Sequence, residues 1–390
     1  MKDNMNLRAQ LWILRSLQFA SFATMALVVA FFPLYFDSLG FSKQQIGAIY
    51  SIGPVLSIFS NLLAGFVSDK TKNVRRVLNL LFVGQILALA LLLPQKEFGL
   101  VAGVMALFYL FQTPVNSMLD SVSLLAAERM QISFPSIRVF GSLGYAVSAV
   151  AFGYLLKVSD STLTLKIGLA TTACALLFSI LLGNFQASVK KFEFGGLWAL
   201  FRRREVVLFF LFIAFVSISH RMNEGFLSVA MRDNGASDFL IGTASLASAV
   251  SEMPIFFLLA KYGQRFKELP LLAIASIMYV VRLSLLSFAD EPWMFVALQM
   301  MHSVTFGIFY ITALRYLLTL VPDEYRSSGQ ALFTVVWSGI AGLVAGLLGG
   351  WLYDSAGLSF VYRIGACTAL VSAIGFLYSH ISPSRRADRG

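Results

Sequence analysis

The chain has 390 residues, of which 58% are hydrophobic and 13% are charged, and its formal net charge is +10. Soluble domains are about 45–50% apolar and about 25% charged, so this composition excludes an ordinary soluble protein. The basic balance does not indicate nucleic-acid binding, because the cytoplasmic loops of membrane proteins also carry an excess of Lys and Arg. Cys174 and Cys367 lie inside apolar runs and indicate neither a disulfide framework nor a metal site.

Long apolar runs separated by short polar breaks recur along the chain. Each is long enough to cross a hydrocarbon core of about 30 Å. Only helices and closed barrels span a bilayer, and the runs are continuous rather than alternating, so they predict helices. The first run is too long for a signal-peptide core and is expected to remain as a membrane helix. Twelve spans are predicted, at about 11–36, 44–68, 75–94, 98–127, 136–157, 163–184, 205–230, 238–260, 268–288, 292–320, 328–353 and 360–380.

Lys and Arg are unevenly divided between the connecting segments. If the N-terminus is inside, the inner segments hold about 19 cations and the outer segments about 6. This predicts a multi-pass protein of the cytoplasmic membrane, expected to be bacterial, with both termini in the cytoplasm. Small residues also recur along the helices, and Gly342, Gly346 and Gly350 follow a spacing that lets a neighbouring backbone approach closely. The simplest interpretation of this glycine stripe is helix packing.

The longest connection, about 185–204, is basic and divides the helices six and six. The predicted fold class is therefore an all-α polytopic membrane protein. Its predicted organisation is an N-terminal six-helix bundle (1–186), a cytoplasmic basic linker (187–204) and a C-terminal six-helix bundle (205–390). Two similar halves are common in secondary transporters.

Ionisable side chains inside the predicted spans carry the functional argument, because a charge near the middle of a bilayer must face a cavity or a partner. His220 and Glu224 share a helix face, and Arg221 can pair with Glu224. Structural alternatives stay open: Arg138 as a cation at a helix end, Arg221 and Glu224 as a structural pair, Glu252 and Arg282 in cross-helix pairs, and His302 as a packing residue. The full set is Asp120, Arg138, His220, Arg221, Glu224, Glu252, Arg282 and His302.

Nucleotide and metal signatures do not appear in the sequence. There is no zinc-type ligand spacing, phosphate-binding glycine loop or dinucleotide fingerprint. No cofactor or metal is therefore expected. Intramembrane carboxylates, arginines and histidines without a nucleotide site favour an ion gradient as the driving force, with the proton as coupling ion.

The segment GFVSDKTKNVRR, residues 65–76, resembles the loop signature of the major facilitator superfamily. The signature residues are Gly65, Asp69, Arg75 and Arg76. Gly65 is expected to allow close helix contact, and Asp69 to pair with the following cations and with a helix N-terminus of the other half. The resemblance implies the major facilitator fold and transport by alternating access.

Finer matches resemble one branch, the phenylpropionate permeases, which are related to lactose permease and to nucleoside–proton symporters. PVNSMLD with Asp120 and RVFGSLGY with Arg138 resemble the cavity-facing carboxylate and arginine of those families. VSEMPIFF, VVRLSLLSF and LQMMHSVTF follow the phenylpropionate permease pattern in the second half. The resemblance implies a solute site of Asp120, Arg138, Tyr145, His220 and Gln299, and a proton-coupling set of Glu252, Arg282, His302 and Glu224.

The sequence departs from lactose permease at three positions. Thr305 stands where that family has its main proton-carrying glutamate, and Gln299 where it has a neighbouring lysine. The proton is therefore expected on Glu252 first and on Glu224 second. Tyr145 stands where lactose permease stacks a tryptophan on its sugar, so galactoside specificity is not implied, although a tyrosine can still stack a ring.

The function predicted is proton-coupled symport, as uptake, of a small organic solute such as an aromatic acid, a sugar or a nucleoside. The expected partners are the solute, protons and the bilayer, with a functional monomer and no nucleic acid. The alternative is proton-antiport export of drugs or metabolites. An enzyme is disfavoured because no nucleophile–base pair or metal cluster is apparent, and a sensor because the short tails leave no room for a signalling domain.

Overall fold

The computed structural model describes residues 2–157, 162–183, 203–322 and 326–381. Within these ranges twelve helical spans are long and apolar enough to cross a membrane, which confirms the predicted all-α polytopic fold. Nine of the spans are carried by one helix each: α3 (Lys43–Thr71), α4 (Val74–Leu92), α5 (Phe98–Met130), α6 (Pro135–Leu156), α7 (Leu163–Leu181), α9 (Arg204–Asp233), α10 (Asp238–Tyr262), α11 (Glu268–Leu286) and α16 (Leu358–Ile381). A 3₁₀ turn, η2 (Gly263–Arg265), follows α10.

Three spans contain a π-helical segment. The first consists of α1 (Lys2–Ala26), η1 (Leu27–Phe31) and α2 (Phe32–Ser38); the tenth of α12 (Pro292–Gln299), η3 (Ser303–Gly307) and α13 (Ile308–Leu320); and the eleventh of α14 (Arg326–Thr334), η5 (Val335–Ile340) and α15 (Ala341–Ala356).

Some helices extend beyond their apolar runs. α3 and α5 each continue about one turn past the predicted end, because helical hydrogen bonding does not stop where hydropathy falls. Both end at a residue in the left-handed conformation, Lys72 at φ 50° and Gln131 at φ 53°. Such a C-cap reverses the chain and stops the helix.

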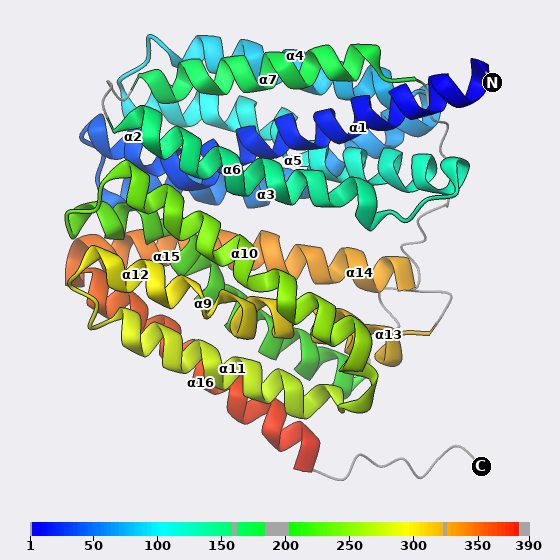
Figure 1. Ribbon diagram of the computed structural model, residues 1–390. Helices are drawn as coiled ribbons and strands as arrows, with labels where there is room; N and C mark the ends of the chain where they lie inside the picture. The colour runs from blue at the N-terminus through cyan, green and yellow to red at the C-terminus, as the bar shows by residue number, and fades with distance from the viewer. Residues whose placement is uncertain (1, 158–161, 184–202, 323–325, 382–390) are drawn as a thin grey trace, which may run out of the picture.

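The helices form two groups, one from α1 to α7 and one from α9 to α16 (Figure 1). In the first group α1 packs against α6 and α7, and α5 packs against α3 and α4. In the second group α16 packs against α9 and α11. The predicted linker, 187–204, lies outside the described residues except for its last two positions.

The two groups meet along two flanks, α3 against α15 and α6 against α10. On the first flank a Cβ added at Gly346 or Gly350 would collide with the backbone of α3 at Gly47 or Gln44. On the second flank Gly153 of α6 lies in the same way against Asp238 of α10. The packing expected of the glycine stripe is therefore confirmed, and it is packing between the halves.

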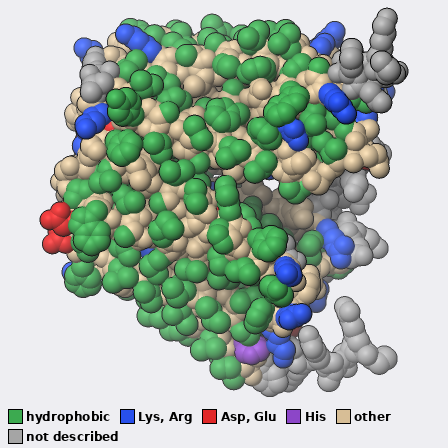
Figure 2. Space-filling model, viewed as in Figure 1, with side chains coloured by type: hydrophobic (Ala, Val, Ile, Leu, Met, Phe, Trp, Pro, Cys, Tyr) green, Lys and Arg blue, Asp and Glu red, His purple; other side chains and the backbone are tan. Residues whose placement is uncertain are grey.

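These contacts lie at the end of the molecule opposite the two termini (Figure 1). α3 still meets the other half at Ile58, where a Cβ at Gly339 would lie 3.3 Å away. Farther along α3, no described atom lies within 4 Å of a Cβ at Gly65, and Phe66 is 65% exposed. On α6, Val139 and Leu143 are likewise exposed at the end that carries the termini. Figure 2 shows the corresponding hollow between the two groups, on a face otherwise covered by hydrophobic side chains, with Lys and Arg mainly toward the ends. The structure is closed at one end and open at the other.

Candidate functional site

Asp120 of α5 and Arg138 of α6 form an ion pair, with Arg138 Nε 3.2 Å from Asp120 Oδ1. The two side chains keep 42% and 32% of their surface exposed, although both helices are membrane spans. A bilayer offers such charges no solvation, so the exposure indicates a water-filled hollow. The geometry leaves further donors and acceptors on both groups free for a polar solute.

Arg138 lies in the first turn of α6, which begins at Pro135. It is therefore a cation near a helix end, as hydropathy alone suggests, and also a group of the hollow, because its long side chain reaches Asp120. The guanidinium lies over the ring of Phe22 at 4.3 Å, and a Cβ at Gly141 would be 2.9 Å from Arg138 Nη1. Phe22 holds the fork by a cation–π contact, and Gly141 makes room for it.

In the second half, Arg282 of α11 is 1% exposed. Its Nη1 donates to Thr305 Oγ1 at 3.1 Å, and its Nη2 donates to Gln299 Oε1. Among the described residues no carboxylate pairs with Arg282 directly. Burying a cation among neutral groups alone costs folding free energy. The nearest carboxylate beyond these ligands therefore serves as the counter-charge of Arg282.

His302 provides the connection to that carboxylate. Its Nδ1 lies 3.1 Å from Arg282 Nη1, and its Nε2 lies 3.0 Å from Glu252 Oε1 of α10. A guanidinium can only donate, so Nδ1 must accept and the ring proton must be on Nε2, from which it is donated to Glu252. Neutral His302 therefore links the cation to the carboxylate. A proton added at Nδ1 would place two donors face to face and separate His302 from Arg282.

A second histidine and carboxylate lie beside this chain. His220 of α9 is 4% exposed, with Nδ1 3.1 Å from the Tyr279 hydroxyl and Nε2 3.8 Å from Glu224 Oε2. Arg221 holds the same Glu224 oxygen at 2.6 Å and donates to Ser338 Oγ at 2.9 Å. The predicted sharing of one helix face and the Arg221–Glu224 pair are both present.

Aromatic rings join the two histidine systems. The rings of His220 and His302 are stacked with centroids 5.5 Å apart, and Phe306 stacks on each at 5.0 Å. Trp337 lies 5.3 Å from His220. One connected cluster therefore contains two carboxylates, two arginines and two histidines, and it includes six of the nine predicted site residues: His220, Glu224, Glu252, Arg282, Gln299 and His302.

Comparison with known proteins identifies the family of this chain. Residues 11–364 match the model of the MFS_1 like family. The chain belongs to the MFS_1 like family. It is 25% identical to the nucleoside permease NupG of Escherichia coli (strain K12), across 97% of both chains. It is 24% identical to the probable 3-phenylpropionic acid transporter of the same organism, across 94% of this chain and 96% of that one.

The fold agrees with that assignment. A crystal structure of the nucleoside transporter NupG superimposes with a TM-score of 0.86 and 19% identity, covering 96% of this chain and 99% of that one. The likeness identifies the major facilitator arrangement, with two six-helix groups meeting along two flanks.

Within this MFS_1 like protein, two predicted solute ligands take different positions from Asp120 and Arg138. Gln299 is 3% exposed and bonded to Arg282, so its carbonyl oxygen is already engaged. Tyr145 is half-buried in α6, next to the flank where α6 meets α10. Thr305, which departs from lactose permease, is a direct ligand of Arg282.

The loop motif is only partly described. Arg75 Nη1 donates to the Leu182 carbonyl at 3.0 Å and ties α4 to the end of α7. Arg76 is exposed, and its backbone N–H is capped by Asn73. The expected close contact at Gly65 is not seen: no described atom lies within 4 Å of a Cβ built there, because this part of α3 has separated from the other half. The Asp69 side chain lies outside the described residues.

Sequence reasoning missed the partners that hold the site residues. Tyr279, Trp337 and Ser338 are ordinary members of apolar runs, and only helix packing brings them to His220 and Arg221. The π segments gave no sequence signal either. η3 follows His302 directly and contains Thr305, while η5 contains Trp337 and Ser338. π turns of this kind occur frequently at functional sites. In the described part of the chain, no group of three metal-ligating side chains is found.

Proposed function

We propose that this protein is a secondary transporter that takes up a small organic solute by alternating access, coupled to protons. The observation that carries the proposal is the chain Arg282, His302 and Glu252, because it links a buried cation to a protonatable carboxylate through a single histidine. A proton on Glu252 would remove the counter-charge of Arg282, so proton binding must alter the packing of α10 against α11 and α12. The same cluster reaches Glu224 through stacked rings.

Alternating access is supported by the contacts between the halves. Both flanks pack tightly at one end through glycines, and both separate toward the other end. Rocking of two rigid halves about the centre would exchange the open end for the closed one. Asp120 and Arg138 on one side and the histidine cluster on the other would then bind the solute between the halves.

For the solute we propose an aromatic acid, a sugar or a nucleoside. The relatives named above are a nucleoside permease and a probable 3-phenylpropionic acid transporter. The Asp120–Arg138 pair suits a ligand with hydroxyl or carboxylate groups, since a carboxylate accepts and a guanidinium donates in a fixed fork. The half-buried Tyr145 offers a ring against which a flat ligand could stack.

We further propose a cytoplasmic membrane location with both termini in the cytoplasm, two bundles divided at the basic linker, and a functional monomer. Under this orientation the structure is the inward-open state. The orientation rests on the distribution of Lys and Arg. Proton coupling needs no resident cofactor, and the basic charge is assigned to membrane topology rather than to nucleic acid.

Proteoliposomes containing the purified protein test the proposal. Nucleosides, sugars and arylcarboxylates are first screened for thermal stabilisation, and a radiolabelled hit is then offered with a pH gradient imposed across the vesicle membrane. We expect accumulation when the outside is acidic, abolished by a protonophore. Solute movement opposite to the proton gradient would support the export alternative, and uptake indifferent to the gradient would refute proton coupling.

A further inference from the structure

The closed end contains an internal repeat with reversed charges. Residues 40–47 read GFSKQQIG and residues 235–242 read GASDFLIG, 195 positions later. Gly40 and Gly235 both have φ 83°, and the following serines both cap a helix, α3 and α10 respectively. The two segments are therefore structural equivalents at the starts of the second and eighth spans.

Each segment contributes one residue to an ion pair whose partner lies six positions earlier in the chain. In the first half Lys43 Nζ lies 2.5 Å from Asp37 Oδ1. In the second half Arg232 pairs with Asp238. The basic residue thus occupies the later position in the first pair and the earlier position in the second. The two equivalent positions therefore carry opposite charges in the two halves: Lys43 corresponds to Asp238, and Asp37 corresponds to Arg232.

Only the first pair extends across the interface among the described ion pairs. Lys43 Nζ also lies 3.3 Å from Asp233 Oδ1 at the end of α9, and the other oxygen of Asp233 accepts from the Tyr353 hydroxyl at 2.8 Å. The ammonium lies 5.8 Å from the centre of the Tyr353 ring, and its side chain is 16% exposed. The Lys43 side chain therefore interacts with one residue of its own half, Asp37, and with two of the other half, Asp233 and Tyr353.

Backbone hydrogen bonds strengthen the same flank. Asp354 accepts from the backbone N–H of Lys43 at 3.0 Å and from that of Gln44 at 2.7 Å. The N-terminus of α3 is thus capped by a carboxylate from α15, in the other half, which favours this position by the helix dipole. These bonds depend on backbone atoms and would survive a change of the Lys43 side chain.

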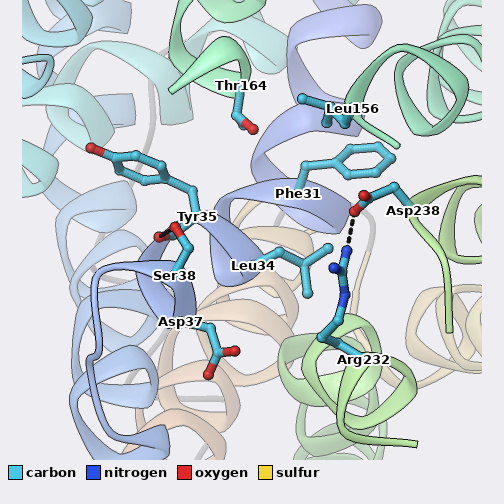
Figure 3. A pocket seen from close by; sticks show the side chains of 9 residues that line it. All are labelled: Phe31, Leu34, Tyr35, Asp37, Ser38, Leu156, Thr164, Arg232 and Asp238. Carbon is cyan, nitrogen blue, oxygen red and sulfur yellow. Dashed lines mark hydrogen bonds and ion pairs between the residues drawn. The ribbon is translucent and has the colours of Figure 1, made fainter. Parts of the chain in front are cut away.

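The counterpart pair lies at a different kind of contact. Arg232 and Asp238 line a pocket of about 190 Å³ between the halves, and Asp37 of the first half also lines it. Figure 3 shows Arg232 and Asp238 directed at one another on one side of this pocket, with Asp37 apart from them. In the described part of the chain this pair makes no ion pair with the first half. At the flank of α3 and α15, an ion pair and hydrogen bonds to carboxylates join the two halves. At the flank of α6 and α10, the halves are joined by close helix packing next to a pocket.

We propose that Lys43 is the latch of the closed end, a positioning residue whose bond to Asp233 stabilises the state that is open toward the termini. This inference rests on the alternating-access mechanism proposed above. Rocking of the halves must break the Lys43–Asp233 bond and leave the Lys43–Asp37 bond intact, because the latter lies within one half. When the closed end opens, Lys43 stays paired with Asp37. Its ammonium therefore has a counter-charge in both states.

A charge exchange tests the latch. The double variant Asp37→Lys with Lys43→Asp keeps an ion pair inside the first half but sets a carboxylate against Asp233. Spin labels at the exposed positions Lys96 and Glu291, one in each half at the closed end, report opening by distance measurements between them. We expect the fraction of long distances, relative to the short ones, to rise about fivefold or more, since loss of an ion pair near the surface changes such a ratio by up to about fivefold and repulsion here replaces the attraction. Adding Asp233→Lys should restore the original distribution.

Two further variants keep the test decisive. Asp233→Asn removes only the charge facing Lys43 and keeps an acceptor for Tyr353, so it should move the distribution in the same direction by a smaller factor even if the double variant folds poorly. Arg232→Asp with Asp238→Arg is the matched exchange in the equivalent pair and should have the smaller effect on the distances. Unchanged distances in both the double variant and Asp233→Asn would overturn the latch. Because the distances need neither solute nor a proton gradient, failure of the transport proposal would appear separately in the vesicle assay.

Discussion

His302 Nε2 lies 3.0 Å from Glu252 Oε1, and the opposite nitrogen of the same ring accepts from Arg282. The neutral ring of His302 therefore lies between the buried Arg282 and Glu252. Among the described residues, Glu252 is the only carboxylate that His302 connects to Arg282. Each protonation state of Glu252 changes the charge balance around Arg282, which is 1% exposed and cannot turn to water. This arrangement connects proton binding to the relative positions of α10, α11 and η3.

Glu252→Gln should uncouple transport from the proton gradient. Glutamine still accepts the hydrogen bond from His302 but cannot gain or lose a proton. We expect solute exchange at near-normal rates and loss of uphill accumulation, measured in proteoliposomes with and without a pH gradient. Glu268→Gln is the matched control, because Glu268 pairs with Arg315 at a helix end at 2.9 Å. Normal accumulation in Glu252→Gln would transfer the role to Glu224.

Arg282→Lys should destabilise the second half despite keeping the charge. The planar fork donates to Gln299, Thr305 and His302 at once, and a single ammonium cannot reach all three. Leaving buried acceptors without donors costs about 1–3 kcal/mol. The melting temperature should therefore fall by several degrees. Arg363→Lys is the control, because Arg363 lies over the exposed ring of Phe288, and it should leave the melting temperature unchanged. Equal melting temperatures would contradict the buried network.

Arg138→Lys should weaken solute binding by about tenfold or more, because the shorter ammonium cannot reach Asp120 from the first turn of α6 while stacking on Phe22. Asp120→Asn should weaken it as well by removing the charge that orients the fork. Affinity is measured by calorimetry with the solute found in the screen, and folded yield is recorded in parallel. Unchanged affinity in both variants at normal yield would remove the pair from the solute site.

Gly346→Val should open the closed end. A side chain there meets Ser51 Oγ and the Gly47 carbonyl, and neither the α3 backbone nor the rigid flank can yield. The spin-label distances across the closed end should lengthen. Gly103→Val is the control, because no described atom lies within 4 Å of a Cβ at Gly103. A closed end that tolerates valine at 346 would show that the glycine approach is not required.

Single cysteines test the membrane orientation, in a background with Cys174 and Cys367 replaced. Placed at Lys96 they should react with an impermeant maleimide in intact cells, and placed at Lys190 or Arg386 they should react only after the membrane is permeabilised. Labelling of position 190 from outside would reverse the orientation, and with it the assignment of the open end to the cytoplasm.

The sequence alone determined the twelve spans, their division into two sets and the identity of the costly intramembrane charges. All of these depend on local composition: an apolar run of sufficient length must form a helix in lipid, whatever its neighbours are. The chain also contains the repeat around Gly40 and Gly235, which is visible once the two segments are compared.

The spacing along α9 already predicted the Arg221–Glu224 pair, but only the tertiary structure decided which charges on different helices meet. Thr305 and Gln299 became ligands of Arg282, His302 was placed between that cation and Glu252, and Lys43 was brought to Asp233, 190 positions away. Hydropathy carries no information on these pairings, because a helix can present any face to several neighbours. They follow instead from which helices pack together: α12 and η3 pack against both α10 and α11 within the second half, and α3 packs against α9 across the halves.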